Sequence, residues 1–222
     1  MSETHVPQSR PIRLLVTGFG PFPGVAVNAS EKFVADLAPR LKPISGLSLA
    51  TRVLPTLWGE SISALGQALA EARPDIALHF GVSQRARGLE IESRARNVCT
   101  LEPDAAGRAP TDCRLVAGGP AWLSSDLDLA RVCRAVRACG APARVSGDAG
   151  SYLCNAVYYA SLRAARQLTP RRSALFVHLP FVLAPGGEMT QGHSLPAALA
   201  LRAGVLLVRE LCRSVPAFGP GT

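Results

Sequence analysis

The segment PIRLLVTGF, residues 11–19, decides the fold. Its aliphatic and β-branched run predicts a buried strand, and the apolar spacing of SEKFVADLAPRL at 30–41 predicts an amphipathic helix. The alternation continues, with strands predicted over 47–55, 75–83, 142–147 and 173–181 and helices over 58–73, 127–140, 151–168 and 195–215. Strands that alternate with helices are typical of an α/β sandwich with a largely parallel sheet, whose ligands bind beyond the carboxyl ends of its strands.

Two segments depart from this alternation. LEIESRARNV, residues 89–98, alternates like a half-exposed strand, and the stretch 101–120, rich in Gly, Pro and Asp, predicts an irregular excursion. With 222 residues and 48% apolar content, the chain can bury one full core. We therefore predict a single α/β domain over 12–215, with flexible tails over 1–11 and 216–222.

The sequence argues against secretion and membrane insertion. Its first ten residues, MSETHVPQSR, lack the apolar segment of a secretory signal. The longest nearly apolar run, SALFVHLPFVLAP at 173–185, is too short to span a bilayer and contains His and Pro. The six cysteines of the chain form no CxxC pair, and no histidine stands at zinc-ligand spacing. We expect a cytoplasmic protein without a metal or other cofactor, whose cysteines are mostly small buried hydrophobes.

The net charge of +8, from 24 basic and 16 acidic residues, raises the question of an anionic partner. Only two of the basic residues are Lys, and the arginines are scattered along the chain rather than gathered in one helix or tail. We therefore expect neither nucleic acid nor membrane as a partner.

One cysteine stands out by its position. In SGDAGSYLCNAVYY, residues 146–159, Cys154 falls in the first turn of a predicted helix, after a run of small and turn-forming residues. Unpaired N–H groups and the helix dipole favour a thiolate at such a site. The alternative is that Cys154 packs inward, as free cysteines mostly do.

A nucleophilic cysteine needs a base, and the chain has four histidines. His178 follows the apolar residues ALFV and should emerge at the sheet edge where Cys154 lies. His193, in the loop QGHSLP, is the second candidate, although a solvated loop side chain is the simpler interpretation. His5 is in the polar first segment, and His79, inside DIALHF, is better explained as a hydrogen-bonded core imidazole.

Four motifs occur in a recognisable order: GFGPFPGVAVN at 18–28, ESRARN at 92–97, DAGSYLCN at 148–155 and FVHLP at 176–180. With these motifs the chain resembles pyroglutamyl peptidase type I, also called pyrrolidone-carboxylate peptidase, from about residue 13 to the terminal helix. The resemblance implies a three-layer α/β/α sandwich and a Cys-His-Glu triad that removes N-terminal pyroglutamate from small peptides. It leaves a homo-oligomer open, because the family forms both monomers and tetramers.

Carried over motif by motif, the resemblance makes Cys154 the nucleophile, His178 the general base and acid, and Glu92 the carboxylate that orients the imidazole. Glu90, on the same face of the predicted strand, and Asp148, six residues before the cysteine, are competing carboxylates. A solvated or Arg-paired carboxylate is the alternative for all three, and Asp148 is better suited to shaping the turn before Gly150.

The chain also departs from the family pattern. GVSQRA at 81–86 does not match the Gly-Gln-Ala-Gly-Gly run of many bacterial members. The glutamate is usually preceded by Pro and followed by Arg-Val-Ala, whereas here Ile91 precedes it and Ser-Arg-Ala follows. The segment 99–120 diverges as well, so its contacts cannot be transferred. These differences bear on substrate preference rather than on the chemistry.

The substrate end is a neutral five-membered lactam, which needs a flat apolar slot with hydrogen-bonding groups. Phe19 and Phe22, after the first strand, could flank this ring, or they could simply cap the core. Asn28 is a further pocket candidate, although it could instead cap the next helix, with Glu31 completing a capping box.

Two other function classes remain open at this point. A nucleoside phosphorylase of similar architecture would need a phosphate site, and no cradle of the form GxxxxGK[ST] occurs in the sequence. A protein that binds pyroglutamyl peptides without turning them over would keep the pocket and lack activity.

Overall fold

The computed structural model describes residues 10–22, 27–168, 172–183 and 194–214. The helices in these ranges are α1 (Ala29–Leu41), α2 (Trp58–Ala72), α3 (Leu129–Arg137), α4 (Leu153–Gln167) and α5 (Ala197–Ser214). The strands are β1 (Ile12–Phe19), β2 (Leu47–Leu54), β3 (Ile76–Val82), β4 (Leu89–Glu92), β5 (Arg94–Arg96), β6 (Trp122–Ser124), β7 (Ala143–Ser146), β8 (Ser173–Leu179), β9 (Phe181–Leu183) and β10 (Ser194–Pro196). Of the predicted tails only Arg10 and Pro11 are described, and Arg10 donates hydrogen bonds to the buried carboxylate of Asp75.

Six strands form one mixed sheet in the order β2-β1-β3-β8-β4-β7. β1, β2, β3 and β8 are parallel, whereas β4 runs antiparallel to β8, and β7 is parallel to β4. The short strands pair separately, β5 with β6 and β9 with β10. The predicted largely parallel, mixed sheet is confirmed, and the two strands that run against the others are β4 and β7.

The prediction of one half-exposed strand over 89–98 is wrong. The segment divides at Ser93 into β4 and β5, and all four residues of β4 are buried. Alternation suggested exposure because two of these residues are glutamates. Their carboxylates are buried with cationic or hydrogen-bonding partners instead, which is how a charged side chain can be placed inside a sheet.

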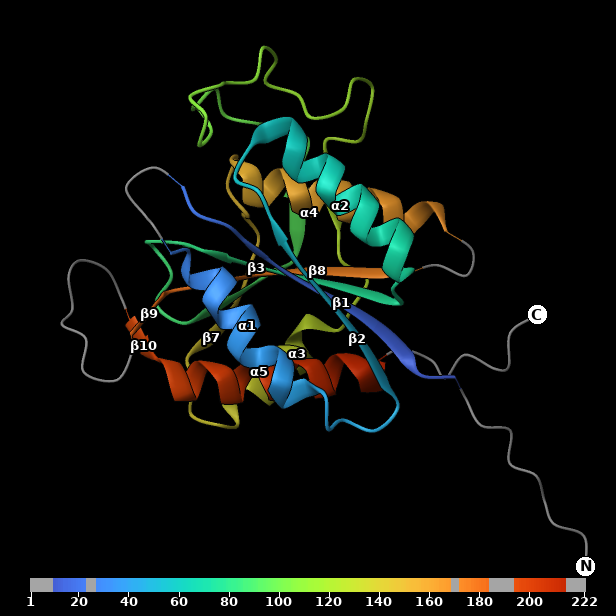
Figure 1. Cartoon of the computed structure of the whole chain (residues 1–222), viewed down its shortest axis with the longest axis vertical. Coiled ribbons are helices and arrows are strands. Elements are labelled where there is room, and N and C mark those ends of the chain that lie inside the picture. Colours follow the sequence, from blue (N-terminus) through green and yellow to red (C-terminus); the bar gives the residue numbers. More distant parts are fainter. Residues whose placement is uncertain (1–9, 23–26, 169–171, 184–193, 215–222) are drawn as a thin grey trace, which may run out of the picture.

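Helices cover both faces of the sheet, so the domain has three layers (Figure 1). α2 and α4 pack on one face, where the apolar cluster includes Leu65, Val157 and Phe176. α1, α3 and α5 pack on the other face, around a second cluster. The predicted α/β/α sandwich is therefore confirmed, and both faces of its central strands are removed from water.

The irregular excursion predicted over 101–120 is confirmed, and the segment without helix or strand is slightly longer, from 97 to 121; hydrogen bonds tie it to two helix starts. Asp104 accepts a hydrogen bond from the N–H of Trp58 (3.1 Å), the first residue of α2, whose own N-cap, Leu57, provides no capping side chain. Asn155, in α4, donates a hydrogen bond from Nδ2 to the carbonyl of Val98 (2.8 Å), within the excursion. The excursion thus links the start of α2 to the start of α4.

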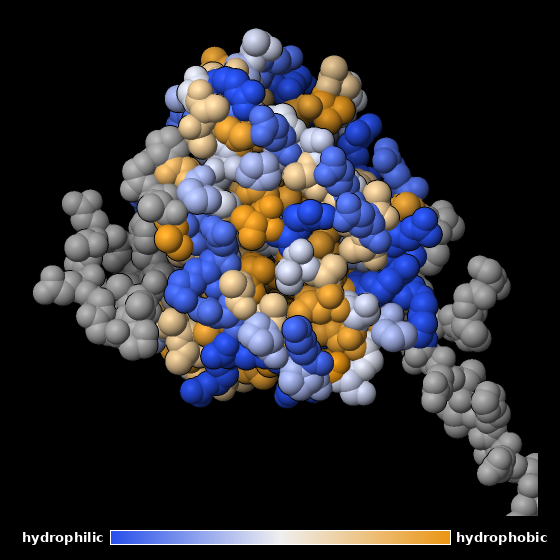
Figure 2. Space-filling model, in the orientation of Figure 1, coloured by the Kyte–Doolittle hydropathy of each residue, from blue (hydrophilic) through white to orange (hydrophobic). Residues whose placement is uncertain are grey.

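On the molecular face shown in Figure 2, hydrophilic and hydrophobic side chains are interspersed. In the part of the chain that the structure describes, no helix is both long enough and apolar enough to cross a membrane.

Candidate active site

Three of the predicted site residues meet on the sheet face covered by α2 and α4. His178 is the penultimate residue of β8, Glu92 is the last residue of β4, and Cys154 is the second residue of α4. The imidazole hydrogen-bonds the carboxylate, and the thiol lies near enough to the same imidazole to raise its pKa. Residues that lie 62 and 24 positions apart in the sequence thereby form one continuous chain of polar groups.

The Cys154 thiol is half-buried between the start of α4 and the sheet. The first N–H of α4 that bonds within the helix is that of Ala156, which donates to the carbonyl of its N-cap, Tyr152 (3.1 Å). The thiol therefore sits beside first-turn N–H groups that precede the helical hydrogen bonds, where the helix dipole favours an anion. The prediction that Cys154 lies in the first turn is confirmed.

The chain reaches this position by a route that differs from the prediction. β7 runs antiparallel to β8, and its last residue, Ser146, pairs with Glu92, which in turn pairs with Phe176. The carboxyl end of β7 is therefore not at the edge where β8 ends. The rule that the two strand ends share an edge was wrong for β7, although the contact between Cys154 and His178 that it predicted does form.

His178 is buried and is held between two acidic groups. Its Nδ1 lies 2.8 Å from Oε1 of Glu92, which leaves Nε2 for the thiol of Cys154. Burial acts to lower the pKa of His178, but the hydrogen bonds and charges of Cys154 and Glu92 outweigh it and raise that pKa to about 10. The imidazolium of His178 is thus the stable form of this side chain near neutral pH.

The two neighbouring glutamates have different partners. Glu90 lies directly opposite His178 in the β4–β8 register, but its Oε1 accepts a hydrogen bond from Nε of Arg144 on β7 (3.0 Å). Glu92, two residues further along β4, has no exposed surface, and its carboxylate turns to the imidazole. The geometry therefore favours Glu92 as the carboxylate that orients His178.

Asp148 lies away from the imidazole. Its carboxylate is about two-thirds exposed, pairs with Arg96 (2.9 Å) and accepts a hydrogen bond from the N–H of Gly150 (3.1 Å). Gly150 has φ +81°, in the left-handed region that favours glycine. The prediction that Asp148 shapes this turn is confirmed.

Phe19 and Phe22, the two candidate pocket rings, differ in their surroundings. Phe19 is 2% exposed and packs against Phe176, with ring centroids 6.3 Å apart. Phe22 is 40% exposed. Phe19 thus belongs to the apolar core beneath the site, whereas the ring of Phe22 is available to a ligand.

Asn28 holds the same loop from inside. It is the N-cap of α1, where its Oδ1 accepts hydrogen bonds from the N–H and the hydroxyl of Ser30, and its Nδ2 donates to the carbonyl of Gly20 (3.0 Å). The hydroxyl of Ser30 in turn accepts from the N–H of Phe19 (3.0 Å). The predicted helix cap is confirmed, with Ser30 as its partner rather than Glu31.

The other histidines are accounted for without a catalytic role. His79 has no exposed surface, its Nδ1 lies 2.8 Å from the hydroxyl of Thr17, and its Nε2 lies 2.8 Å from that of Ser161. Burial lowers the pKa of His79 to about 3, so the ring is neutral, and the prediction of a core imidazole is confirmed. His193 and His5 lie outside the described residues.

Two aromatic side chains beside the site, Tyr158 and Phe176, were not predicted as site residues from the sequence. Tyr158 is fully buried, and its hydroxyl donates a hydrogen bond to the carbonyl of Glu92 (2.8 Å). Phe176 lies under the imidazole of His178, with ring centroids 4.8 Å apart. A signal for Tyr158 was present, because it follows Cys154 by four residues and so lies on the same face of α4.

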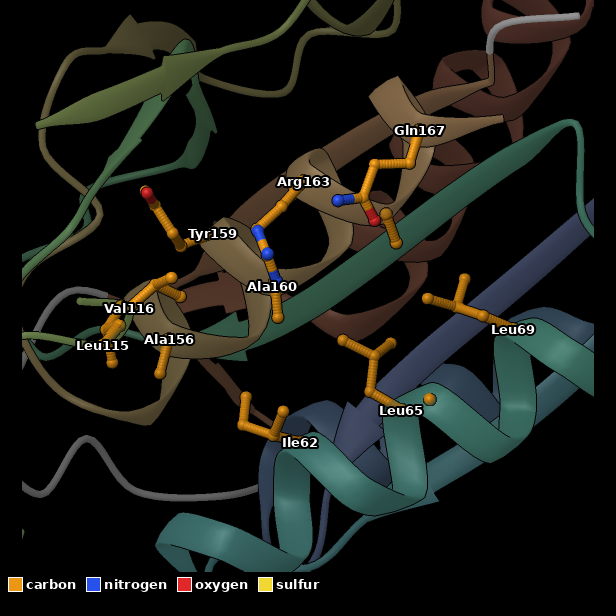
Figure 3. Close-up of a pocket in the computed structure, with 12 residues that line it drawn as sticks. Ile62, Leu65, Leu69, Leu115, Val116, Ala156, Tyr159, Ala160, Arg163 and Gln167 are labelled. Carbon is orange, nitrogen blue, oxygen red and sulfur yellow. The ribbon is translucent and has the colours of Figure 1, made fainter. Parts of the chain in front are cut away.

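A separate cavity of about 260 Å³ lies between α2 and α4 (Figure 3). Its lining is mainly apolar and comprises Ile62, Leu65, Gly66, Leu69, Leu115, Val116, Ala156, Tyr159, Ala160, Arg163, Ala164 and Gln167. None of the three candidate catalytic residues lines it. Within the described ranges, no group of three or more His, Cys, Asp or Glu side chains is arranged to hold a metal ion.

Comparison with known proteins relates the chain to one family. The family model for pyroglutamyl peptidase matches residues 12–209. Pyrrolidone-carboxylate peptidase 1 of Ralstonia nicotianae is 38% identical over 170 residues, which cover 76% of this chain and 78% of the relative. The pyrrolidone-carboxylate peptidase of Gloeobacter violaceus is 33% identical over 204 residues, or 91% of this chain and 98% of the relative.

Solved structures agree with this relationship. The pyrrolidone carboxyl peptidase of Fervidobacterium islandicum has a TM-score of 0.83 at 31% identity and covers 92% of this chain and 100% of its own. A mutant pyrrolidone carboxyl peptidase from Pyrococcus furiosus has a TM-score of 0.82 at 29% identity, covering 91% and 99%. The match extends through every element that carries the candidate site, and the chain belongs to the pyroglutamyl peptidase family.

Proposed function

We propose that this protein is a cysteine-dependent omega-peptidase that removes N-terminal pyroglutamate from small peptides. The observation that carries the proposal is the contact of Cys154, His178 and Glu92 on one face of the sheet. A thiol, an imidazole and a buried carboxylate in this order supply a nucleophile, a general acid and base, and an orienting anion. Relatives named as pyrrolidone-carboxylate peptidases support the substrate class.

The reaction proceeds in two steps. The thiolate of Cys154 attacks the carbonyl carbon of the peptide bond that follows the pyroglutamyl residue, and the electron pair of this carbonyl moves to its oxygen. As the C–N bond breaks, the imidazolium of His178 donates its proton to the leaving amine and a thioester remains. A water molecule, deprotonated by His178, then attacks the thioester and releases pyroglutamate and the thiolate.

The first turn of α4 is the better source of oxyanion-stabilising donors. The alternative source is the loop after β3, where several N–H groups already have acceptors. The N–H of Ser83 donates to the carbonyl of Leu179, that of Arg85 to the Ser83 hydroxyl, and that of Ala86 to the Ser83 carbonyl. The N–H groups of the first turn of α4 precede the helical hydrogen bonds and point toward the thiol end of the helix. An oxyanion formed beside Cys154 would meet these donors and the positive end of the helix dipole.

Recognition of the lactam is assigned to the loop after β1. Phe22 offers an exposed ring against which the flat lactam can lie. Phe19 and Asn28 act behind it, Phe19 by anchoring the end of β1 in the core and Asn28 by bonding the carbonyl of Gly20. This loop therefore presents one contact residue and two supporting residues.

The remaining expectations become part of the proposal. A cytoplasmic location is supported by the six described cysteines, all of which are free, as in a reducing compartment. Ion pairs such as those of Arg13 with Asp75 and Arg131 with Glu210 use basic side chains within the protein, which fits the absence of a nucleic-acid partner. The proposed triad is built by one chain, so it is compatible with a monomer and with a homo-oligomer.

The test is release of a fluorophore from a pyroglutamyl amide, with and without a thiol-alkylating agent. We expect turnover that iodoacetamide abolishes. A protein that only binds pyroglutamyl peptides would protect its thiol in the presence of the amide and release no fluorophore. Turnover that survives complete alkylation of Cys154 would contradict the thiol mechanism.

A further inference from the structure

A glycine in β3 lies directly under the proposed nucleophile. Gly81 pairs with His178 in the parallel register of β3 and β8, so the two residues are neighbours in one row of the sheet. A Cβ atom built on Gly81 would lie 2.8 Å from Sγ of Cys154 and 2.8 Å from Cζ of Phe176. Both distances are shorter than real side-chain contacts, so the thiol and the Phe176 ring together occupy the space that any larger residue at position 81 would fill.

Backbone conformation does not explain this glycine. Gly81 lies inside a regular strand and is not among the described glycines with positive φ, which are 46, 107, 118, 140 and 150. Glycine weakens a strand because it adds backbone entropy to the unfolded chain and offers no side chain for packing. Its presence in a buried central strand therefore points to close approach by other groups, and these are the thiol of Cys154 and the ring of Phe176.

From this geometry we infer that Gly81 is a positioning residue that seats the Cys154 thiol beside His178. The inference rests on the proposed function for its catalytic meaning. The absent side chain lets Sγ settle on the strand within hydrogen-bonding reach of the imidazole in the same row. The ring of Phe176 limits the space on the other side. Position 81 thereby sets where the nucleophile lies without contacting the substrate.

The test compares Gly81→Ala with wild type in three measurements. The added methyl group should force the thiol to rotate away from His178. We expect kcat to fall by about 100-fold or more with KM nearly unchanged, since misplacement of a reacting group by about 1 Å costs on this order. The rate of Cys154 alkylation by iodoacetamide at pH 7 should fall at least several-fold, because the displaced thiol loses its imidazolium partner.

Alkylation needs no pyroglutamyl substrate, so it separates this inference from the proposed function. Gly66→Ala is the matched control, because Gly66 lies in α2 with nothing within 4 Å of its added Cβ. That variant should keep wild-type turnover and alkylation. Wild-type alkylation in folded Gly81→Ala would overturn the inference, even if the protein never hydrolysed a pyroglutamyl amide.

A double-mutant cycle keeps the test decisive if Gly81→Ala is unstable. The loss of thermal stability caused by Gly81→Ala is measured in the wild type, in Cys154→Ala and in Phe176→Leu. If the added methyl group competes with sulfur for space, its effect on Tm should be smaller when the sulfur is absent. An equal Tm loss in the wild-type and Cys154→Ala backgrounds would overturn the inference. Relief of the Tm loss by Phe176→Leu but not by Cys154→Ala would also overturn it, because the added methyl group would then compete with the ring and not with the thiol.

Discussion

Replacing Glu92 by Gln would test the buried end of the row of polar groups formed by Cys154, His178 and Glu92. The substitution keeps the size of the side chain and removes its charge from a site with no exposed surface. Nδ1 of His178 lies 2.8 Å from Oε1, so the lost interaction is one charge-assisted hydrogen bond. Such bonds contribute about 1.5–3 kcal/mol, which converts to about a 10- to 150-fold loss in kcat/KM.

The variant should also change the pH profile. Glu92 is one of the two groups that raise the pKa of His178 from its ordinary 6.5 to about 10, so Glu92→Gln should lower that pKa. The imidazolium donates the proton to the leaving amine, and the alkaline limb of kcat/KM should therefore move to lower pH. A raised histidine pKa stabilises the fold fully below pH 6.5, and this stabilisation is lost as pH rises through about 10. The difference in free energy of unfolding between wild type and Glu92→Gln should therefore become smaller as the pH rises from 6.5 to about 10.

The assay is hydrolysis of a pyroglutamyl fluorogenic amide across the pH range, with urea unfolding of the same samples. Glu90→Gln and Asp148→Asn are the matched carboxylate controls, because Glu90 bonds Arg144 and Asp148 pairs with Arg96 at the surface. Both should keep kcat/KM within a few-fold once any loss of folded protein is corrected. The reasoning is refuted if Asp148→Asn costs more activity than Glu92→Gln at equal stability, or if Glu92→Gln leaves the alkaline limb unmoved.

Side chains around the site can be tested for their effects on stability and on substrate selectivity. Tyr158→Phe removes the hydrogen bond to the carbonyl of Glu92 and should lower stability by about 0.5–1.5 kcal/mol in urea unfolding, together with a drop in kcat. Asn28→Ala removes the cap of α1 and should lower stability by about 1 kcal/mol, whereas unchanged unfolding would contradict the capping role. A prolyl amide lacks the lactam carbonyl, so the wild type should prefer the pyroglutamyl amide by about 10⁴-fold in kcat/KM, and similar rates on both amides would rule out a site that recognises the lactam. Phe22→Ala should lower the turnover of the pyroglutamyl amide without unfolding the protein, because the ring of Phe22 is exposed.

Much of the architecture could be predicted from local patterns. Apolar runs such as 11–19 and 75–83 identify buried strands because both sheet faces are covered by helices, and the helix containing Cys154 follows from its 3.6-residue spacing. The cysteine's place in the first turn followed from that helix alone. These features depend on residues close together in the sequence.

Strand direction and register could not be predicted in the same way. β4 and β7 run against the other four strands, which no local pattern reports, so the edge at which β7 ends was placed wrongly. The choice between Glu90 and Glu92 also depends on partners distant in sequence, because only the packed sheet brings Arg144 to Glu90. Nothing in the local sequence explains a glycine at position 81, because the Cys154 thiol, which lies where a side chain at this position would be, is more than 70 residues later in the sequence.

The central claim is that the thiol of Cys154 performs the hydrolysis. Its most direct test is kcat/KM on a pyroglutamyl fluorogenic amide for wild type, Cys154→Ser and Cys133→Ser, with the folded fraction of each measured by circular dichroism. Cys133 is buried in the core on the opposite face of the sheet and serves as the control. We predict a folded Cys154→Ser variant whose kcat/KM falls by about 10³-fold or more, because serine lacks the thiolate that His178 stabilises, and a Cys133→Ser variant close to wild type. Wild-type rates in Cys154→Ser, or equal inactivation of a folded Cys133→Ser variant, would contradict the claim.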